Sequence, residues 1–155
     1  METTRRTPGV VPEKRGSRII SDVNYEISFR EDPRLFTVTT SGVATAAGFE
    51  AFTVELLKHA RWIPGTPILI DHSRAITNQL QAEDVHKIAK SVVALAERTG
   101  SAPLALIMPS DVAFGMARMW QQLTELDSPM QISIFRSMDE ANPWLAQLES
   151  REQSD

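Results

Sequence analysis

The fold is decided by Pro67-Ile68-Leu69-Ile70, an apolar run that leads directly into the polar residues Asp71-His72-Ser73-Arg74. A strand that is apolar on both faces belongs inside a sheet covered by helices, so its polar residues emerge at its carboxyl end. In open α/β sheets this edge is where ligands and partners bind. The sequence therefore predicts where a site lies, although it contains no motif of a named chemistry.

Four further segments have the pattern of strands. Apolar residues alternate from Val23 to Arg30, as in a half-buried strand, and a turn over 31–34 leads to a second strand over 35–40. The short turn predicts an antiparallel hairpin. Short apolar runs over 104–108 and 132–135 predict the last two strands.

Helices are expected between and after the later strands. The spacing of apolar residues and the capping signals predict four of them: a helix over 46–62, a helix from Ala82 to Thr99, a helix after the N-cap Ser110, and a helix after the capping box Ser137–Glu140. Right-handed crossovers then return each later strand parallel to the one before it. The result is an α/β fold with a single mixed, mostly parallel five-stranded sheet in the order β-β-α-β-α-β-α-β-α, with 23–30 as its antiparallel edge.

Composition and charge exclude several classes of function. The chain has 155 residues, 42% of them hydrophobic and 23% charged, which is typical of one soluble globular domain. A net charge of −4 gives the molecule no overall attraction for phosphate backbones, so no nucleic-acid partner is expected. The chain has no cysteine, which excludes disulfides, thiolate metal sites and cysteine nucleophiles.

The domain boundaries follow from periodicity. Residues 1–17 mix Thr, Pro, Gly and charge without a repeat and are expected to form a disordered leader, followed by one domain over 18–149 and a frayed tail over 150–155. The first residues lack the apolar core of a signal peptide, and no run approaches the length of a membrane span. A cytoplasmic protein without membrane insertion is the expectation.

Three segments carry a family resemblance: GTPILIDHSRAITNQLQAEDVHKI, SDVAFGMARMWQQL and MQISIFRSMDEANPWL. Together they resemble the SpoIIAA-like family, bacterial domains related to STAS and STAS/SEC14-like domains, over residues 23–148. The resemblance implies a sheet wound as successive βα units with helices packed against it. It also implies a regulatory or protein-interaction module, and the SEC14 relationship implies a hydrophobic ligand.

One family feature is not carried over. In the anti-anti-sigma branch of STAS domains, a serine in an Asp-Ser-Ser-Gly-like motif is phosphorylated at the start of the helix after the central strand. The corresponding stretch here is Thr77-Asn78-Gln79-Leu80-Gln81, which lacks the motif. Ser73 and Thr77 are the nearby hydroxyl residues, and neither stands in it. The resemblance therefore implies no phosphorylation switch.

The polar cluster Asp71–Arg74 has three interpretations. Asp71 and His72 would be an acid–base pair in an enzyme, because histidine titrates near neutral pH. Neighbours in an extended segment point to opposite faces, which argues against a Ser-His dyad. In a purely structural role, Asp71 and Ser73 would cap loop amides while His72 and Arg74 face solvent. In a binding role, all four would contact a ligand or partner.

Phe114 is the second candidate. At about 100° per residue, it lies opposite the apolar face of its helix, which is formed by Val112, Ala113, Met116, Ala117, Met119, Trp120 and Leu123. An exposed aromatic ring near the sheet edge can line a pocket or anchor a partner. Alternatively, the loop 75–80 folds over it.

These residues give two non-catalytic hypotheses and one catalytic one. The first is a regulatory or interaction domain that binds a protein partner or small ligand through residues at the carboxyl edge: Asp71, His72, Ser73, Arg74, Ile76, Thr77, Asn78, Leu80, Ser110, Asp111 and Phe114. The second is a carrier of an apolar or lipid-like molecule in a cavity under the 71–81 loop, lined by Ile76, Leu80 and Phe114. The third is a small enzyme that uses Asp71 and His72, for which no catalytic motif is present.

No metal or cofactor is expected, because His59, His72 and His86 do not converge and no His-x-x-x-His motif is present. A homodimer is a further expectation, either through Phe114 or through strand 23–30, because an uncovered edge strand invites pairing.

Overall fold

The structure is a computed structural model that describes residues 2–6 and 23–154, with side chains described from 23 to 150. The strands are β1 (Glu2–Arg6), β2 (Asn24–Glu31), β3 (Arg34–Val43), β4 (Ile68–Ile76), β5 (Pro103–Ile107) and β6 (Gln131–Phe135). The helices are α1 (Ala46–Leu57), α2 (Ala82–Ala94), α3 (Ala96–Thr99), α4 (Asp111–Glu125) and α5 (Met138–Ser154). The predicted fold class, one mixed α/β sheet with helices packed on it, is confirmed.

The described sheet has six strands in the order β1-β2-β3-β4-β5-β6, one more than the sequence predicts. β1 pairs antiparallel with β2, with Thr4 opposite Ile27. The prediction of a leader is therefore wrong for residues 2–6, because backbone pairing recruits a polar segment that has no apolar repeat. The prediction that 23–30 is a free edge is wrong for the same reason. Residues 7–22, which include the rest of the expected leader, lie outside the described residues.

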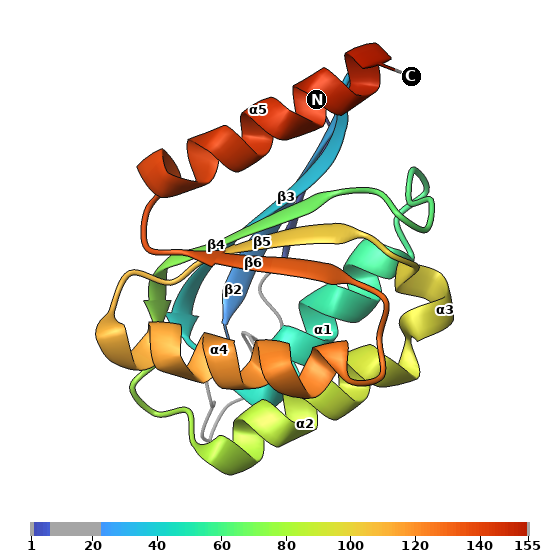
Figure 1. The fold of residues 1–155 in the computed structure, drawn as a ribbon. Helices are drawn as coiled ribbons and strands as arrows, with labels where there is room; N and C mark the ends of the chain where they lie inside the picture. Colours follow the sequence, from blue (N-terminus) through green and yellow to red (C-terminus); the bar gives the residue numbers. More distant parts are fainter. Residues whose placement is uncertain (1, 7–22, 155) are drawn as a thin grey trace.

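The remaining pairings explain the layers. β2 and β3 form the predicted antiparallel hairpin, and β3-β4, β4-β5 and β5-β6 are parallel. Each crossover from β3 to β6 leads to the adjacent strand on the same side, in the order β3-β4-β5-β6. Because these crossovers are all right-handed, their helices α1, α2 and α4 lie on one face of the sheet. After β6, the chain turns to the other face, which α5 covers (Figure 1).

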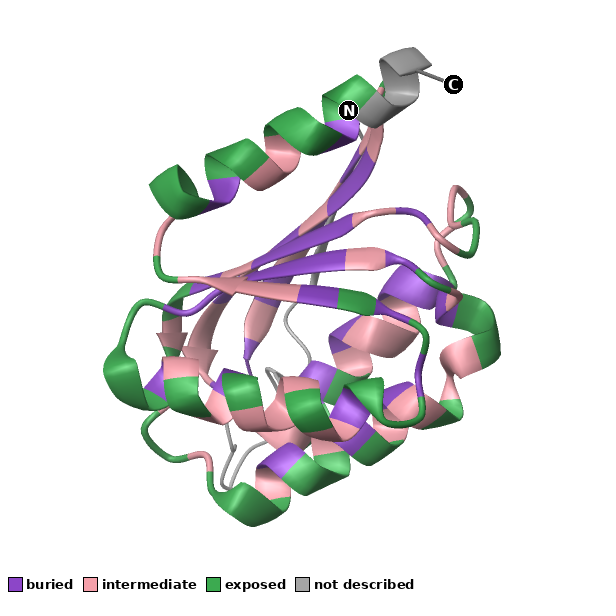
Figure 2. Ribbon diagram, viewed as in Figure 1, coloured by how far each residue is buried: buried purple, intermediate pink, exposed green. Residues whose placement is uncertain are grey.

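Alternation along the strands divides the core into two clusters. Ile68 and Ile70 of β4 join the larger cluster under α1, α2 and α4, which also contains Phe36 and Leu104. Leu69, between them, joins the smaller cluster under α5. Purple buried segments accordingly run through the middle of the sheet in Figure 2. Burial on both faces confirms the interpretation of 67–70 as a central strand.

The ends of two helices differ from the prediction. The helix predicted over 46–62 ends at Leu57. Beyond it, the side chain of His59 accepts a hydrogen bond from the Arg61 amide through Nδ1 at 3.0 Å, which forms a turn in place of another helical turn. The tail expected to fray over 150–155 instead continues α5 to Ser154. Within the described residues, no helix combines the length and the continuous apolar stretch needed to cross a bilayer.

Helix starts follow the predicted caps. The side chain of Ser110 accepts a hydrogen bond from the Ala113 amide at 3.1 Å at the start of α4. At the start of α5, Ser137 Oγ accepts from the Glu140 amide at 3.2 Å, as a capping box requires. The Glu140 carboxylate accepts a hydrogen bond from the Arg136 amide at 2.9 Å. In a standard capping box it would accept from the amide of the N-cap residue itself, Ser137.

Candidate functional site

The polar cluster Asp71–Arg74 lies within a strand and not in a loop. β4 extends to Ile76 and pairs with β3 over this whole length, whereas its pairing with β5 stops at Asp71. The predicted loop over 71–81 is therefore reduced to the residues between Ile76 and α2. The register shifts between Thr39 and Ser41 of β3, so that Thr40 faces an extra residue of β4. Such irregularities re-aim side chains locally.

His72 points into the core. It follows Ile68 and Ile70 at the two-residue period of a strand, and it is only 4% exposed. Its ring stacks on Phe49 with centroids 4.9 Å apart, and its Nδ1 lies 2.8 Å from Thr40 Oγ1. Burial lowers the pKa of His72 from 6.5 to about 4, against a smaller opposing effect of the Asp71 charge. His72 is therefore neutral at pH 7, and the prediction that it faces solvent is wrong.

Asp71 and Ser73 form a separate local contact. Asp71 Oδ1 accepts hydrogen bonds from the Ser73 amide at 2.9 Å and from Ser73 Oγ at 2.6 Å. The structural role that the sequence offers for the pair is thus met only in part, because Asp71 caps the Ser73 amide within a strand and Ser73 Oγ donates to Asp71 and caps no amide. Arg74 is exposed, as predicted. The Asp71 carboxylate thus bonds to Ser73 while His72 bonds to Thr40, so the structure does not join Asp71 and His72 by a hydrogen bond.

A cavity of about 90 Å³ lies between the sheet and α1, α2 and α4. Every layer contributes apolar side chains, including Phe49, Phe52 and Leu56 of α1, Val85, Ile88 and Val92 of α2, and Met116, Ala117 and Trp120 of α4. None of its lining residues is Asp, Glu, Lys or Arg. A binding site of this composition suits an uncharged, largely apolar molecule.

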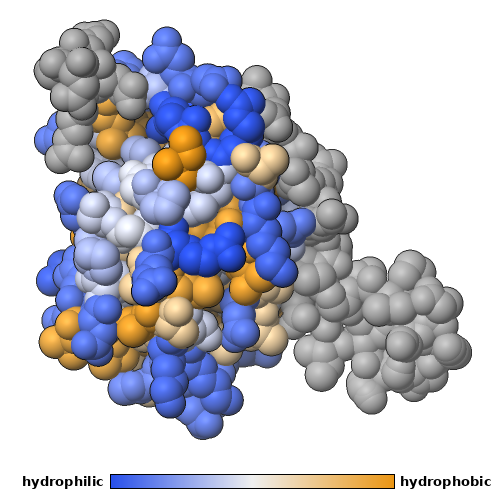
Figure 3. Space-filling view, turned by 90° about the vertical axis from the view of Figure 1, so that its right-hand side faces the viewer, coloured by the Kyte–Doolittle hydropathy of each residue, from blue (hydrophilic) through white to orange (hydrophobic). Residues whose placement is uncertain are grey.

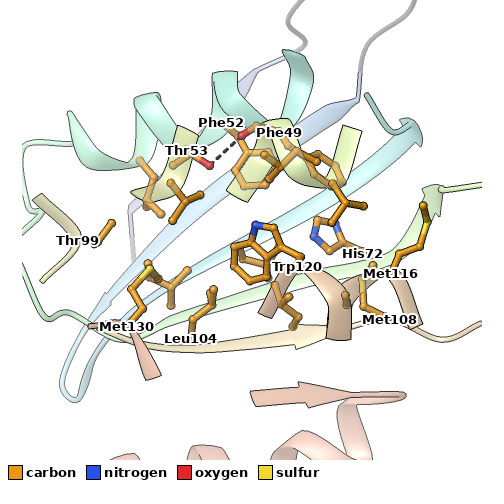
Figure 4. Close-up of a pocket in the computed structure, with 18 of the residues that line it drawn as sticks. Phe49, Phe52, Thr53, His72, Thr99, Leu104, Met108, Met116, Trp120 and Met130 are labelled. Atoms are coloured by element: carbon orange, nitrogen blue, oxygen red, sulfur yellow. Dashed lines mark hydrogen bonds between the residues drawn. The ribbon is translucent and has the colours of Figure 1, made fainter. Parts of the chain in front are cut away.

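The cavity is elongated along the strands. Leu104, Leu106 and Met108 line it at two-residue spacing, which corresponds to roughly 13 Å of extended chain. In Figure 4, Thr99 and Met130 lie at one end of the pocket, and His72 and Met116 lie at the other. The shape therefore runs from the amino end of the strands to the polar cluster at their carboxyl end.

The pocket contains few polar groups, and most of them are bonded within the protein. Thr53 Oγ1 donates to the Phe49 carbonyl at 2.8 Å, as Figure 4 shows, and Thr99 Oγ1 donates to the Ala96 carbonyl at 3.2 Å. Trp120 is different, because its Nε1 is buried and has no hydrogen-bond partner in the described part of the chain. A buried donor without an acceptor costs about 1–3 kcal/mol, so such groups are rare.

Phe114 is half-buried, and a side chain from beyond β6 lies over its ring. The guanidinium of Arg136, just after β6, lies 4.5 Å from the centroid of the Phe114 ring and also pairs with Asp111. Val112, predicted on the buried face of α4, is 70% exposed, because the first turn of the helix extends past the sheet.

The structure divides the predicted site residues between the pocket and the surface. Leu80 and His72 line the pocket. Ile76 is 49% exposed, and neither it nor Phe114 is among the lining residues, so the predicted lining is correct only for Leu80. Asn78 is exposed, and the Thr77 carbonyl accepts from the Leu80 amide at 3.1 Å in a turn.

The sequence contained a signal for the inward position of His72. Ile68, Ile70 and His72 share one strand face, so continuing the period by two residues would have placed His72 inside. The pocket roles of Phe49 and Trp120 had no such signal, because an apolar helix face does not show whether it closes completely on the sheet. Thr40 was missed because its contact with His72 depends on the register irregularity between β3 and β4.

No group of three or more His, Cys, Asp or Glu residues is arranged to hold a metal ion in the part that the structure describes. On the side of the molecule that carries α3, Figure 3 shows apolar side chains interleaved with polar ones. The pocket is therefore the feature of the structure that most resembles a binding site.

Comparison with known proteins supports the fold. The sequence matches no protein-family model and no curated protein. A solved structure of an uncharacterised protein of the DUF3478 family from Shewanella loihica PV-4, described as having a SpoIIAA-like fold, is similar with a TM-score of 0.55 and 18% sequence identity. The match covers 83% of this chain and 98% of that one. The resemblance found in the sequence is thus confirmed at the level of architecture, and this chain has the SpoIIAA-like fold.

Proposed function

We propose that this chain is a non-catalytic STAS-like domain that binds a small apolar molecule in the pocket between the sheet and helices α1, α2 and α4. The observation that carries the proposal is the pocket itself, which is elongated and lined almost entirely by apolar side chains. Burial of apolar surface is the main driving force for binding in such a site.

The size of the pocket limits what it can hold without movement. Its volume of about 90 Å³ is smaller than the roughly 150 Å³ of an engineered apolar cavity that binds benzene. A ligand much larger than a short alkyl chain therefore requires α2 or α4 to move away from the sheet. Met116 and Trp120 of α4 are only partly buried, and so is Ile88 of α2, so both helices have lining side chains that reach the surface.

The pocket also supports a non-catalytic role. A reaction site needs an acid, a base and groups that stabilise charge in one place. The lining includes one titratable group, His72, whose lowered pKa of about 4 keeps it neutral and without charge at pH 7. Asp71, its proposed partner, is instead bonded to Ser73.

The proposal can be tested by comparing native and denaturing mass spectrometry of the purified protein. We expect a bound small molecule in the native spectrum that is lost on denaturation, or saturable binding of 1-hexanol if the protein is purified empty. Ala117→Leu fills the pocket from α4 and should abolish this binding, whereas the exposed Ala146→Leu on α5 should retain it. Unchanged binding by a folded Ala117→Leu variant, or no binding by the wild type, would contradict the proposal.

One observation favours a second candidate function, self-association through the carboxyl edge. Three of the exposed large apolar side chains lie at the carboxyl ends of neighbouring strands or in the helices that follow them: Ile76 ends β4 at 49% exposure, Val112 of α4 is 70% exposed and Met138 of α5 is 41% exposed. Exposed apolar residues at one edge of a sheet favour an interaction surface. Sedimentation velocity of the wild type and Val112→Glu checks this, since the variant should be monomeric where the wild type is dimeric. A monomeric wild type rejects it.

A further inference from the structure

The absence of charge in the pocket restricts the ligand. No acidic residue, lysine or arginine is among the residues that line it, and His72 is neutral at pH 7. Transfer of an ionised carboxylate or ammonium group into such surroundings is strongly unfavourable unless a counter-charge or several hydrogen bonds meet it. A charged head group would therefore have to remain outside the pocket.

Trp120 supplies one unused donor. Its Nε1 is enclosed by protein atoms and lacks an acceptor among the described residues. By contrast, Nε1 of Trp62 donates to the Arg98 carbonyl at 2.8 Å. Buried tryptophan N–H groups usually have a partner. An acceptor carried by a ligand would remove the cost of leaving this donor unpaired, and a pure hydrocarbon would not.

His72 adds a second polar position in the same pocket. Its Nδ1 lies 2.8 Å from Thr40 Oγ1, so this nitrogen is already paired within the protein. The stacked Phe49 ring fixes the plane of the imidazole. In Figure 4, the Trp120 indole and the His72 imidazole both lie within the group of pocket residues, among otherwise apolar side chains. The polar part of a ligand would thus be recognised toward the His72 end and not at Thr99.

From these contacts we infer that the pocket selects an uncharged ligand with an apolar body and a single neutral hydrogen-bonding group, such as an alcohol, that accepts a hydrogen bond from Trp120 Nε1. This inference rests on the proposed function and adds the chemical class of the ligand. The inference predicts that neutral amphiphiles bind better than alkanes, because alkanes leave the Trp120 donor unpaired. It also predicts that they bind better than fatty-acid anions and alkylammonium ions, because these ions bring an unpaired charge into the pocket.

The test uses the indole N–H signals of the full-length protein with ¹⁵N-labelled tryptophan. The chain has three tryptophans, so Trp120→Phe assigns its signal by removal. The protein is titrated at neutral pH with 1-hexanol, hexane, hexanoate and hexylammonium. We expect 1-hexanol to shift the Trp120 N–H signal downfield, hexane to bind without this shift, and the two ions to bind at least about tenfold more weakly than 1-hexanol.

Variants separate hydrogen bonding from packing. Trp120→Phe keeps an aromatic ring and removes the N–H, so the affinity for 1-hexanol should fall about fivefold while that for hexane is unchanged. Trp144→Phe is the matched control, because Trp144 belongs to α5 and packs against the smaller core cluster on the other face of the sheet. It should change neither affinity.

The outcomes distinguish the two proposals. If none of the four compounds binds, the proposed function fails and the inference fails with it. If 1-hexanol and hexane bind equally well without a shift of the Trp120 signal, or if hexanoate binds as tightly as 1-hexanol, the proposed function stands and the inference is overturned. An equal loss for both neutral compounds in Trp120→Phe would also overturn it, because it would show that Trp120 acts by packing.

Discussion

Helices α1, α2 and α4 cover one face of the sheet, whereas among the described residues α5 is the one helix on the other face, and much of α5 is green and exposed in Figure 2. The first face carries the larger core cluster, the pocket and the buried His72. The second has six buried residues in its cluster, with Trp144 and Leu145 half-buried beside them. The first is the pocket face of the sheet and the second is its α5 face.

This difference between the two faces indicates which of them can contain a ligand cavity without losing too much folding stability. A pocket reduces packing, and packing is the main source of stability. The pocket face can contain a cavity because three helices and several aromatic rings, among them Phe49 and Phe52, surround it. The α5 face has too little buried surface to lose any to a cavity.

The largest expected difference between the faces comes from two neighbours on β3. Phe36 is fully buried on the pocket face, and Leu35 is buried on the α5 face. Phe36→Ala should lower the free energy of unfolding by about 4 kcal/mol, and Leu35→Ala by about 2 kcal/mol, because the cavity left beside the exposed α5 can relax more easily. Urea denaturation measures both. Equal losses would show that the two clusters contribute similarly.

The next effect depends on pH and belongs to the pocket face. His72 has a pKa of about 4 in the folded protein and 6.5 as its ordinary value, so the unfolded chain binds more protons between these pH values. Stability should therefore rise with pH in this window, and about 3 kcal/mol should be lost as the pH falls from about 6.5 to about 4. Chemical denaturation at several pH values should show this loss in the wild type.

The contribution of His72 is isolated by comparing variants. His72→Gln should lose this part of the pH dependence, while the exposed His86→Gln serves as the matched control. If wild type and His72→Gln have parallel pH profiles, His72 is not the buried neutral group described here.

A smaller effect compares two threonines on opposite faces of β3. Thr40 is buried and bonds to His72, whereas the neighbouring Thr39 is half-buried. Thr40→Val leaves the buried imidazole nitrogen unpaired and should cost about 1–3 kcal/mol. Thr39→Val should change stability by less than about 0.5 kcal/mol. Thermal unfolding of the two variants measures the difference, and equal melting temperatures would argue against a structural hydrogen bond at Thr40.

The smallest effect is expected at the carboxyl edge, where both faces meet. Arg136 covers Phe114 and pairs with Asp111, but both charged side chains are largely exposed. Arg136→Ala should therefore cost less than about 1 kcal/mol. Arg118→Ala, an exposed arginine of the same helix as Phe114, is the control. A loss well above this range in Arg136→Ala would indicate that the cation holds α4 against the start of α5.

Most of the architecture could be predicted from local patterns. The apolar run at 67–70, the hairpin, and the caps at Ser110 and Ser137 are determined by side chains close in sequence, and they are present in the structure. Two features that were not predicted involve partners distant in the chain. β1 exists by backbone pairing with β2, and Phe114 is covered by Arg136 from beyond β6.

The sequence by itself determined the order of the strands from β2 to β6 and the central position of β4, because hydrophobic periodicity and capping act over a few residues. Tertiary structure alone decided that His72 is neutral, that Trp120 Nε1 has no hydrogen-bond partner among the described residues, and that a cavity lies between the sheet and the helices. These properties depend on how closely α1, α2 and α4 approach the sheet. That distance is set by the combined packing of many side chains and not by any short stretch of sequence.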